Sequence, residues 1–379
     1  MKEMQMNPLN AIQHPYPYPY YAELTQERPF YFDNRLNLWV ASDAASVSAI
    51  LNASQMQVRP VAQPVPTGLI DTPAGEVFGQ LVRMQDGEYH RQLKSTIIQA
   101  LSSVDSQYVR ALATDITSML LHQKADINKL MFLVPASVIA TLCGFVPNTI
   151  PEIVSLISEF ILCIPSTAGV EQQQRASQAA RQLMTFFAKE IEQAEQGTLL
   201  SELLQAASDK GRIQRAALIA NAIGFLSQTY DATAGLIGNT LLAYRRYPDA
   251  FATNVLPTFI KEVSRFDAPI QNTLRFAATS FSHNSQQVEQ GQTVLLLLAA
   301  ANRDPASTAY PHEFIPGRMQ EQSFTFSDGK HHCPGAKLAQ DMACGVIDTL
   351  LKYEPNWTEK QYRVRYLPSG NARIPEFIF

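Results

Sequence analysis

The longest helix-compatible stretch of this sequence covers residues 212–247, and it constrains the fold more than any other feature. At a rise of 1.5 Å per residue, the helix would be on the order of 50 Å long. Alanine, isoleucine and leucine occupy most of its faces. We therefore expect it to run through the interior of a large domain rather than along a surface.

A group of polar residues lies in the middle of this stretch: Gln228, Thr229, Asp231 and Thr233. Polar groups buried within an apolar helix need hydrogen-bond partners or a function. The group is therefore a candidate site. A structural cluster with satisfied partners, or a stretch that faces water, would explain it equally well.

Helical periodicity continues through most of the chain, whereas strand patterns are few. Further helices are expected over residues 21–26, 44–52, 88–101, 106–123, 126–142, 150–163, 171–195 and 199–207. Strands are expected over residues 30–32 and 36–42, joined by a turn at Asn34-Arg35, and over residues 293–297 and 374–379. Residues 54–79 contain four prolines and predict a long lid or binding loop. The fold class is mainly α with small β-sheets, and the absence of repeats and linkers predicts a single domain over residues 1–379.

Charge and cysteine spacing disfavour several classes of function. The net charge is −4 and there is no run of Lys or Arg, so we expect no nucleic-acid partner. Residues 1–21 hold no apolar stretch, so we expect no membrane association and a cytoplasmic protein. The four cysteines, Cys143, Cys163, Cys333 and Cys344, lack CxxC spacing, which disfavours a zinc site or a disulfide framework.

One of these cysteines, Cys333, lies in a turn-rich loop over residues 326–336, just before a helical segment. Gly329 and Gly335 flank it, and two glycines let a backbone turn tightly and approach another body closely. Phe326 supplies an apolar wall. A thiolate ligand to haem iron needs such a setting. Zinc binding by His331-His332-Cys333 is disfavoured, because adjacent ligands give poor tetrahedral geometry.

The spacing FxxGxxxCxG in this loop resembles the haem-binding loop of the cytochrome P450 family. Three further segments resemble family motifs in the same order: Glu262 to Arg265 as the ExxR pair, residues 301–305, and residues 314–318, whose arginine completes a buried ion network in the family. Alone, the ExxR pair would be an ordinary pair on a helix surface. The resemblance extends over about residues 15–379.

The resemblance implies the cytochrome P450 fold, with a long central helix across the haem and the cysteine loop on the opposite face. It also implies haem b as the cofactor, with Cys333 as the ligand to the iron. The residues that it assigns to cofactor binding are His90, Lys94, Arg275, Phe326, Gly329, His331 and Gly335. His90 and Lys94 stand one helical turn apart, where relatives carry a histidine and an arginine.

The long helix departs from the family pattern. Asp231 takes the place of the family's acid, but Ala232 stands where most relatives have a threonine, and Gln228 and Thr229 replace a pair of small residues. Thr233 is rotated by about 100° around the helix and cannot simply substitute. Our hypothesis is that a substrate hydroxyl or an ordered water, held by Gln228 or Thr233, completes proton delivery from Asp231.

The activity that the resemblance implies is insertion of one oxygen atom of O2 into a hydrophobic or weakly polar small molecule, such as a secondary metabolite. Substrate contacts are expected from residues 54–79, 161–169, 269–273 and 367–374, which are largely apolar. Electrons would come from a separate ferredoxin-type partner and its reductase, and Arg91, Lys94, Lys330 and Lys337 could meet that partner. Oxidative coupling, desaturation, peroxide-driven oxidation and a non-catalytic haem-binding role are the alternatives.

Overall fold

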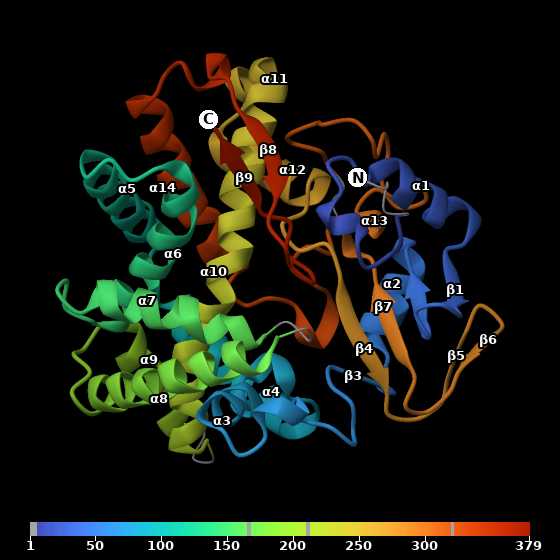
Figure 1. Cartoon of the computed structure of the whole chain (residues 1–379), viewed down its shortest axis with the longest axis horizontal. Helices are drawn as coiled ribbons and strands as arrows, with labels where there is room; N and C mark the ends of the chain where they lie inside the picture. The colour runs from blue at the N-terminus through green and yellow to red at the C-terminus, as the bar shows by residue number, and fades with distance from the viewer. Residues whose placement is uncertain (1–5, 165–167, 210–212, 320–321) are drawn as a thin grey trace. The chain divides into compact units, whose positions relative to one another are not determined.

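The computed structural model describes residues 6–164, 168–209, 213–319 and 322–379, and the chain divides into two compact units. We call them the sheet unit and the helical unit. The sheet unit comprises Met1–Val61, Ala234–Cys333 and Leu350–Phe379, and the helical unit comprises Ala62–Thr233 and Pro334–Thr349. Figure 1 labels their elements. A single domain over residues 1–379 stays a prediction.

A five-stranded sheet forms the centre of the sheet unit, with strand order β1-β2-β7-β4-β3. Its strands are β1 (Phe30–Asp33), β2 (Leu38–Ala41), β7 (Thr293–Leu296), β4 (Thr273–Ala277) and β3 (Met56–Gln57). The predicted hairpin is confirmed, since β1 pairs antiparallel with β2. Strands β2 and β7 run parallel, whereas β4 runs antiparallel to both β7 and β3.

Alternate residues of β7 point to opposite faces of this sheet, as the period of two requires. Val294 and Leu296 pack in a cluster with residues of α2 (Ala44–Asn52). Leu295 belongs to a second cluster, with residues of α1 (Tyr18–Glu27). Helices therefore cover both faces, and this explains why β7 reads as a continuous apolar run.

Two small sheets complete the strands: β5 (Phe281–His283) with β6 (Gln286–Val288), and β8 (Arg363–Tyr366) with β9 (Pro375–Ile378). The expectation that strands return only at 293–297 and 374–379 is wrong, because β3, β4, β5, β6 and β8 are also present. These strands are short or carry polar residues, so their apolar pattern is weak.

The remaining helices of the sheet unit are short. They are η1 (Ala11–Gln13), α11 (Pro248–Thr253), α12 (Leu256–Phe266), α13 (Leu298–Ala301), η5 (Gly329–His331) and η6 (Trp357–Glu359). The predicted start of α2 at Ala44 is confirmed, because the side chain of Asp43 accepts a hydrogen bond from the backbone N–H of Ser46.

The helical unit follows the predicted series closely. It contains α4 (Gly87–Ser102), α5 (Ser106–His122), α6 (Ile127–Cys143), α7 (Ile150–Phe160), α8 (Val170–Glu192) and α9 (Leu199–Ser208), with short turns η2 (Thr67–Leu69), η3 (Val82–Met84) and η4 (Ile161–Cys163). The helix expected over 150–163 ends as the tighter turn η4.

The expectation of a loop without regular structure over residues 54–79 is wrong, because α3 (Pro73–Gln80) occupies its end. Thr72 caps this helix by accepting a hydrogen bond from the N–H of Gly75. Pro73 stands in the first turn, where a missing N–H costs nothing. Proline was therefore a helix-start signal here and not a loop signal.

The long helix is confirmed as α10 (Arg215–Arg246), with 32 residues. Arg212, the expected first residue, lies outside the described part of the chain, as do residues 165–167 of an expected substrate segment. The helix is shared by both units, which divide between Thr233 and Ala234. Helix α14 (Ala336–Tyr353) follows the cysteine loop (Figure 1). Among the described residues, no helix combines the length and apolar character needed to cross a membrane.

Candidate functional site

The loop that carries Cys333 is closed by its own backbone. The N–H of Cys333 donates to the carbonyl oxygen of Phe326 over 2.7 Å. Between them, Ser327 (φ 62°) and Gly329 (φ 59°) adopt left-handed conformations and make the chain turn back. Cys333 is partly buried, and α14 begins three residues later at Ala336. The thiol is thus held at a fixed position at the end of a tight loop.

The loop is anchored to α2 through Asp328. Its Oδ1 accepts from the N–H of Gly329 over 2.7 Å, and its Oδ2 accepts from Ser48 Oγ over 3.2 Å and from Asn52 Nδ2 over 3.1 Å. A Cβ on Gly329 would lie 2.2 Å from Asn52 Oδ1. Gly329 is therefore needed for the approach to α2 as well as for its positive φ. Asp328 is not among the residues predicted from the sequence, although an aspartate directly before a glycine is a known turn signal.

A buried ion network lies beneath the segments that lead to the loop. Arg265 Nη2 and Arg318 Nε donate to the same oxygen, Glu262 Oε1, over 2.7 Å and 3.0 Å. Arg265 also donates to the carbonyl oxygens of Asn302, Pro311 and Glu313. The side chains of Glu262 and Arg265 are only 3% and 2% exposed. The predicted network is confirmed, and the alternative of a surface pair is wrong.

Asn302 connects this network to the cysteine loop. Its Oδ1 accepts from the N–H of Phe324 over 2.6 Å, and its Nδ2 donates to Thr325 Oγ1 over 2.9 Å. Thr325 Oγ1 in turn donates to the carbonyl oxygen of Ser264 in α12. The entry to the loop is thus fixed by fully buried hydrogen bonds. The sequence analysis treated Asn302 only as part of a motif and did not predict this positioning role.

Arg275 lies on β4, with 4% of its surface exposed. Its Nη1 donates to Thr273 Oγ1 over 3.2 Å and to the carbonyl oxygen of Leu274 over 2.8 Å. The cysteine loop meets the neighbouring strand, since Lys330 Nζ donates to the carbonyl oxygen of Met56 in β3 over 3.2 Å. Because Met56 pairs with Ala277 of β4, the loop lies at the same edge of the sheet as Arg275's strand.

The other predicted cofactor residues occupy three elements. His331 is partly buried in η5, next to the loop cysteine. Gly335 begins the first turn of α14, where its carbonyl oxygen accepts from the N–H of Ala339 over 3.0 Å. On α4, His90 is 3% exposed and Lys94 is partly buried. The buried position of His90 fits its predicted role better than that of a solvated surface residue.

The polar turn of α10 contains the three predicted catalytic residues. They differ in whether their polar groups have hydrogen-bond partners. Burial raises the pKa of the Asp231 carboxyl from 3.8 to about 6. Gln228 Nε2 donates to the carbonyl oxygen of Gly224 on its own helix over 3.2 Å. Thr233 is completely buried, and its Oγ1 has no hydrogen-bond partner among the described residues. This turn therefore holds one carboxyl that titrates near neutral pH and one hydroxyl without a protein partner.

The structure groups the predicted residues by unit. Cys333, Phe326, Gly329, His331 and Arg275 belong to the sheet unit, whereas His90, Lys94, Gly335, Gln228, Asp231 and Thr233 belong to the helical unit. The donor set fits haem: one positioned thiol suits the iron, and His, Lys and Arg side chains suit two carboxylates. The Thr233 hydroxyl, which has no partner among the described residues, is a further polar group that a bound molecule would satisfy.

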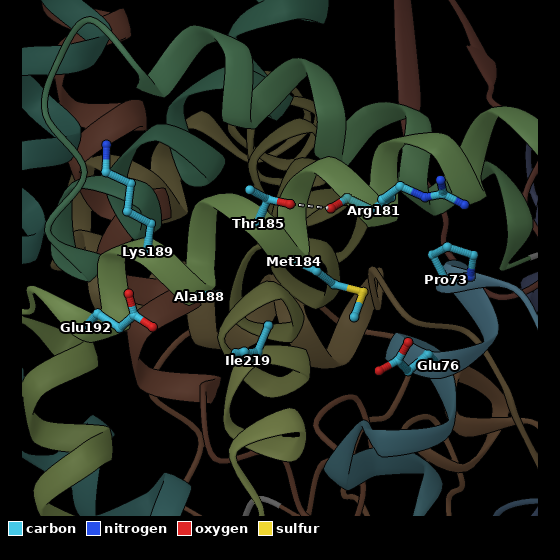
Figure 2. A pocket seen from close by; sticks show the side chains of 9 residues that line it. All are labelled: Pro73, Glu76, Arg181, Met184, Thr185, Ala188, Lys189, Glu192 and Ile219. Atoms are coloured by element: carbon cyan, nitrogen blue, oxygen red, sulfur yellow. Dashed lines mark hydrogen bonds between the residues drawn. The ribbon is translucent and has the colours of Figure 1, made fainter.

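A hollow of about 640 Å³ lies on the helical unit between α3, α8 and α10 (Figure 2). It is lined by Pro73, Glu76, Arg181, Met184, Thr185, Ala188, Lys189, Glu192 and Ile219. Exposed charges of both signs surround its apolar residues. Pro73 and Glu76 belong to the segment 54–79 that is expected to contact the substrate, but none of the predicted catalytic or cofactor-binding residues lines the hollow. We do not assign the active site to this hollow.

Several known proteins resemble this chain over most of its length. The family model "Cytochrome P450" matches residues 252–361. The chain is 29% identical over 306 residues to a putative cytochrome P450 133B2 of Xylella fastidiosa, covering 76% of each protein. It is 28% identical over 278 residues to 6-deoxyerythronolide B hydroxylase of Saccharopolyspora erythraea, covering 69% of the chain and 68% of the relative.

The fold has solved counterparts as well. P450BioI, crystallised in complex with hexadec-9Z-enoic acid ligated acyl carrier protein, superposes with a TM-score of 0.81. It shares 24% sequence identity and covers 95% of this chain and 97% of its own. This likeness establishes the fold, mainly α with small sheets.

Proposed function

We propose that this chain, an oxidoreductase of the cytochrome P450 family, is a monooxygenase that inserts one oxygen atom of O2 into a hydrophobic or weakly polar small molecule. The observation that carries this proposal is the cysteine loop, in which a backbone hydrogen bond, two left-handed residues and Asp328 hold one thiol in place. The similarity to a relative named as a hydroxylase of 6-deoxyerythronolide B supports a small-molecule substrate.

The cofactor that we propose is haem b, with Cys333 as the ligand to iron. The residues that would donate to its two propionates are His90, Lys94, Arg275 and His331. Phe326, Gly329 and Gly335 would shape the backbone beside it. When bound, haem supplies O2 activation and electron transfer, with the thiolate favouring cleavage of the O–O bond.

The chain's own contribution to the reaction is proton delivery. A carboxyl with a pKa of about 6 is suited to this task, because both its protonated and its ionised forms are populated near neutral pH. Ala232 provides no hydroxyl. We assign the relay to an ordered water or a substrate hydroxyl. It would be held by Thr233, whose hydroxyl has no partner among the described residues, or by Gln228, whose amide would have to leave the carbonyl oxygen of Gly224.

Replacement of Ala232 by Thr tests this assignment through the coupling of electrons to product. We expect Ala232→Thr to change the coupling and Gln228→Ala to lower it. Unchanged coupling in Ala232→Thr together with normal coupling in Gln228→Ala would disprove the hypothesis.

The proposed electron source is a ferredoxin-type protein with its reductase. The candidate contact residues are basic: Arg91, Lys94, Lys330 and Lys337. Lys337 pairs with Asp341 over 2.9 Å, and Arg91 pairs with Glu88, so part of their charge is already neutralised. A cytoplasmic location is proposed as well, since all four cysteines are free thiols and suit a reducing compartment.

A second mode of action, in which the same cofactor drives oxidative coupling, desaturation or peroxide-dependent oxidation, is favoured by the altered turn of α10. The missing threonine at position 232 removes the usual relay of the O2-dependent reaction. Comparing turnover with a ferredoxin pair and with peroxide separates the two modes.

The deciding experiment is the reduced-CO absorption spectrum of the purified protein, which reports thiolate ligation. We expect the thiolate band in the wild type and its complete loss in Cys333→Ser. Cys344→Ala is the control, because Cys344 is a buried packing residue of α14. A wild-type protein that neither contains nor takes up haem would refute the proposed function.

A further inference from the structure

Arg83 is an arginine without a hydrogen-bond or ion-pair partner among the described residues. It lies in η3, between α3 and α4, and its Nε atom is buried with no hydrogen-bond partner among the described residues. No ion pair or hydrogen bond to its guanidinium is formed by the described part of the chain. Other arginines of the same unit have carboxylate partners: Arg110 pairs with Asp341 and Arg175 with Glu159.

The charge of Arg83 is uncompensated as well. Burial lowers the pKa of its guanidinium, and Cys163 is the only titratable group in the described residues that acts on it. Cys163 brings no negative charge, because burial raises the pKa of its thiol to about 11 and its Sγ donates to the carbonyl oxygen of Phe160 over 3.1 Å. A desolvated cation without an anion is costly, so a bound anion would stabilise it.

The turn that carries Arg83 is held rigidly. Asn221 of α10, which is 1% exposed, accepts from the N–H of Val82 at its Oδ1 over 2.8 Å. Its Nδ2 donates to the carbonyl oxygen of Gln80 over 2.9 Å. Leu81 packs against Gly224, where an added Cβ would lie 2.9 Å from Leu81 Cδ2. The backbone that leads into Arg83 is thus fixed before any ligand binds, and this lowers the entropic cost of binding.

We propose that Arg83 binds a carboxylate group of the substrate, which would then be an apolar molecule with an anionic end, such as a long-chain carboxylic acid. This inference rests on the proposed monooxygenase function. The positive charge of Arg83 has no negatively charged partner in the described residues. Its neighbour Cys163 lies in the segment 161–169, which we expect to contact the substrate. Guanidinium groups bind carboxylates with two parallel hydrogen bonds.

The carboxylate of haem is the other anion that Arg83 could meet. The neighbourhood of Cys163 favours the substrate, since the residues assigned to the propionates in this unit, His90 and Lys94, lie on α4. Arg83 and Asp231 do not act on each other's charge. The anionic end of the substrate would therefore bind away from the carboxyl that delivers protons.

Equilibrium dialysis with matched pairs of ligands tests the proposal without reliance on turnover. The probes are octanoate, dodecanoate and hexadecanoate, each compared with the alcohol of the same length. We expect the wild type to prefer at least one acid over its alcohol. Arg83→Gln should weaken binding of that acid by about tenfold to a hundredfold and leave binding of the alcohol within about twofold.

Three measurements decide between the sources of the anion. Arg175→Gln, which removes the same charge from an exposed ion pair of this unit, should bind the acid like the wild type. Arg83→Gln should keep the wild-type haem content and an unchanged or higher melting temperature, because it removes an unpaired buried charge. A wild type without preference for any acid, or Arg83→Gln with unchanged acid binding, would overturn the proposal.

Loss of haem from Arg83→Gln, with unchanged acid binding in the loaded fraction, would assign Arg83 to a haem carboxylate and also overturn it. Failure of the wild type to show thiolate ligation would instead refute the proposed function, whatever the dialysis gives.

Discussion

The ion network behind the cysteine loop is a buried cluster of polar groups, and the polar turn of α10 is a partly buried one. They differ in how many of their groups have partners. In the network, Glu262, Arg265 and Arg318 satisfy one another and take up neighbouring carbonyl oxygens. In the turn, Asp231 has a raised pKa and Thr233 Oγ1 has no partner among the described residues. Polar groups that have partners stabilise the fold, whereas polar groups without partners are available to bind a ligand or to take part in a reaction.

Arg83 and Arg265 repeat this difference with the same side chain. Arg265 makes its hydrogen bonds to Glu262 and to three carbonyl oxygens within the sheet unit. Arg83 makes none within the described residues of the helical unit. Burial alone does not separate structural from functional polar residues, but the count of partners does.

The largest effect is expected from Glu262→Ala. Removal of this carboxylate leaves two buried guanidinium groups unpaired, and we expect the free energy of unfolding to fall by about 3–5 kcal/mol in urea titrations. Glu159→Ala is the control, because it breaks an ion pair with the half-exposed Arg175 and should change stability little. Equal losses of stability in the two variants would mean that the buried network contributes no more to stability than the exposed ion pair.

Asp231→Asn should raise the stability of the fold, whereas Glu262→Ala should lower it. Because burial raises the pKa of Asp231 from 3.8 to about 6, the folded state binds more protons than the unfolded state between these values. Its ionisation therefore destabilises the fold as pH rises through this window, by roughly 3 kcal/mol at most. Asp231→Asn should exceed the wild type in stability, with a gap that grows between about pH 4 and about pH 7. A gap independent of pH would contradict this.

Gly329→Ala tests how tightly the cysteine loop is fitted to α2. Gly291 has a positive φ of 86° but no atom within 4 Å of an added Cβ, whereas Gly329 has both a positive φ and Asn52 in the way. We expect Gly291→Ala to cost about 1 kcal/mol and Gly329→Ala about 2–3 kcal/mol in thermal unfolding. Equal costs would show that Asn52 moves aside freely.

The smallest effect comes from a pair of completely buried threonines on α10. Thr240 Oγ1 donates to the carbonyl oxygen of Leu236 over 2.7 Å, so Thr240→Val should cost about 1 kcal/mol. Thr233→Val removes a hydroxyl without a described partner, and we expect the melting temperature to stay the same or rise. A clear loss of stability in Thr233→Val would place Thr233 among the structural groups.

Much of the fold could be predicted from local pattern. The helices from α4 to α9 and the first hairpin follow from periodicity and turn residues, which act over a few positions. Strand β4 and helix α3 were missed, because Arg275 interrupts an apolar pattern and Pro73 carries opposite meanings in a loop and at a helix start.

The sequence by itself determined the cofactor loop, the order of the motifs and the departure at Ala232, because these depend on residue identity and spacing. Only the tertiary structure decided which buried polar groups are satisfied. The partners of Asn302 and Asp328 lie 23 and 280 residues away at Thr325 and Ser48, and no local pattern reports such pairs. Arg83 stands out for the same physical reason: a missing partner is visible only when all neighbours in space are known.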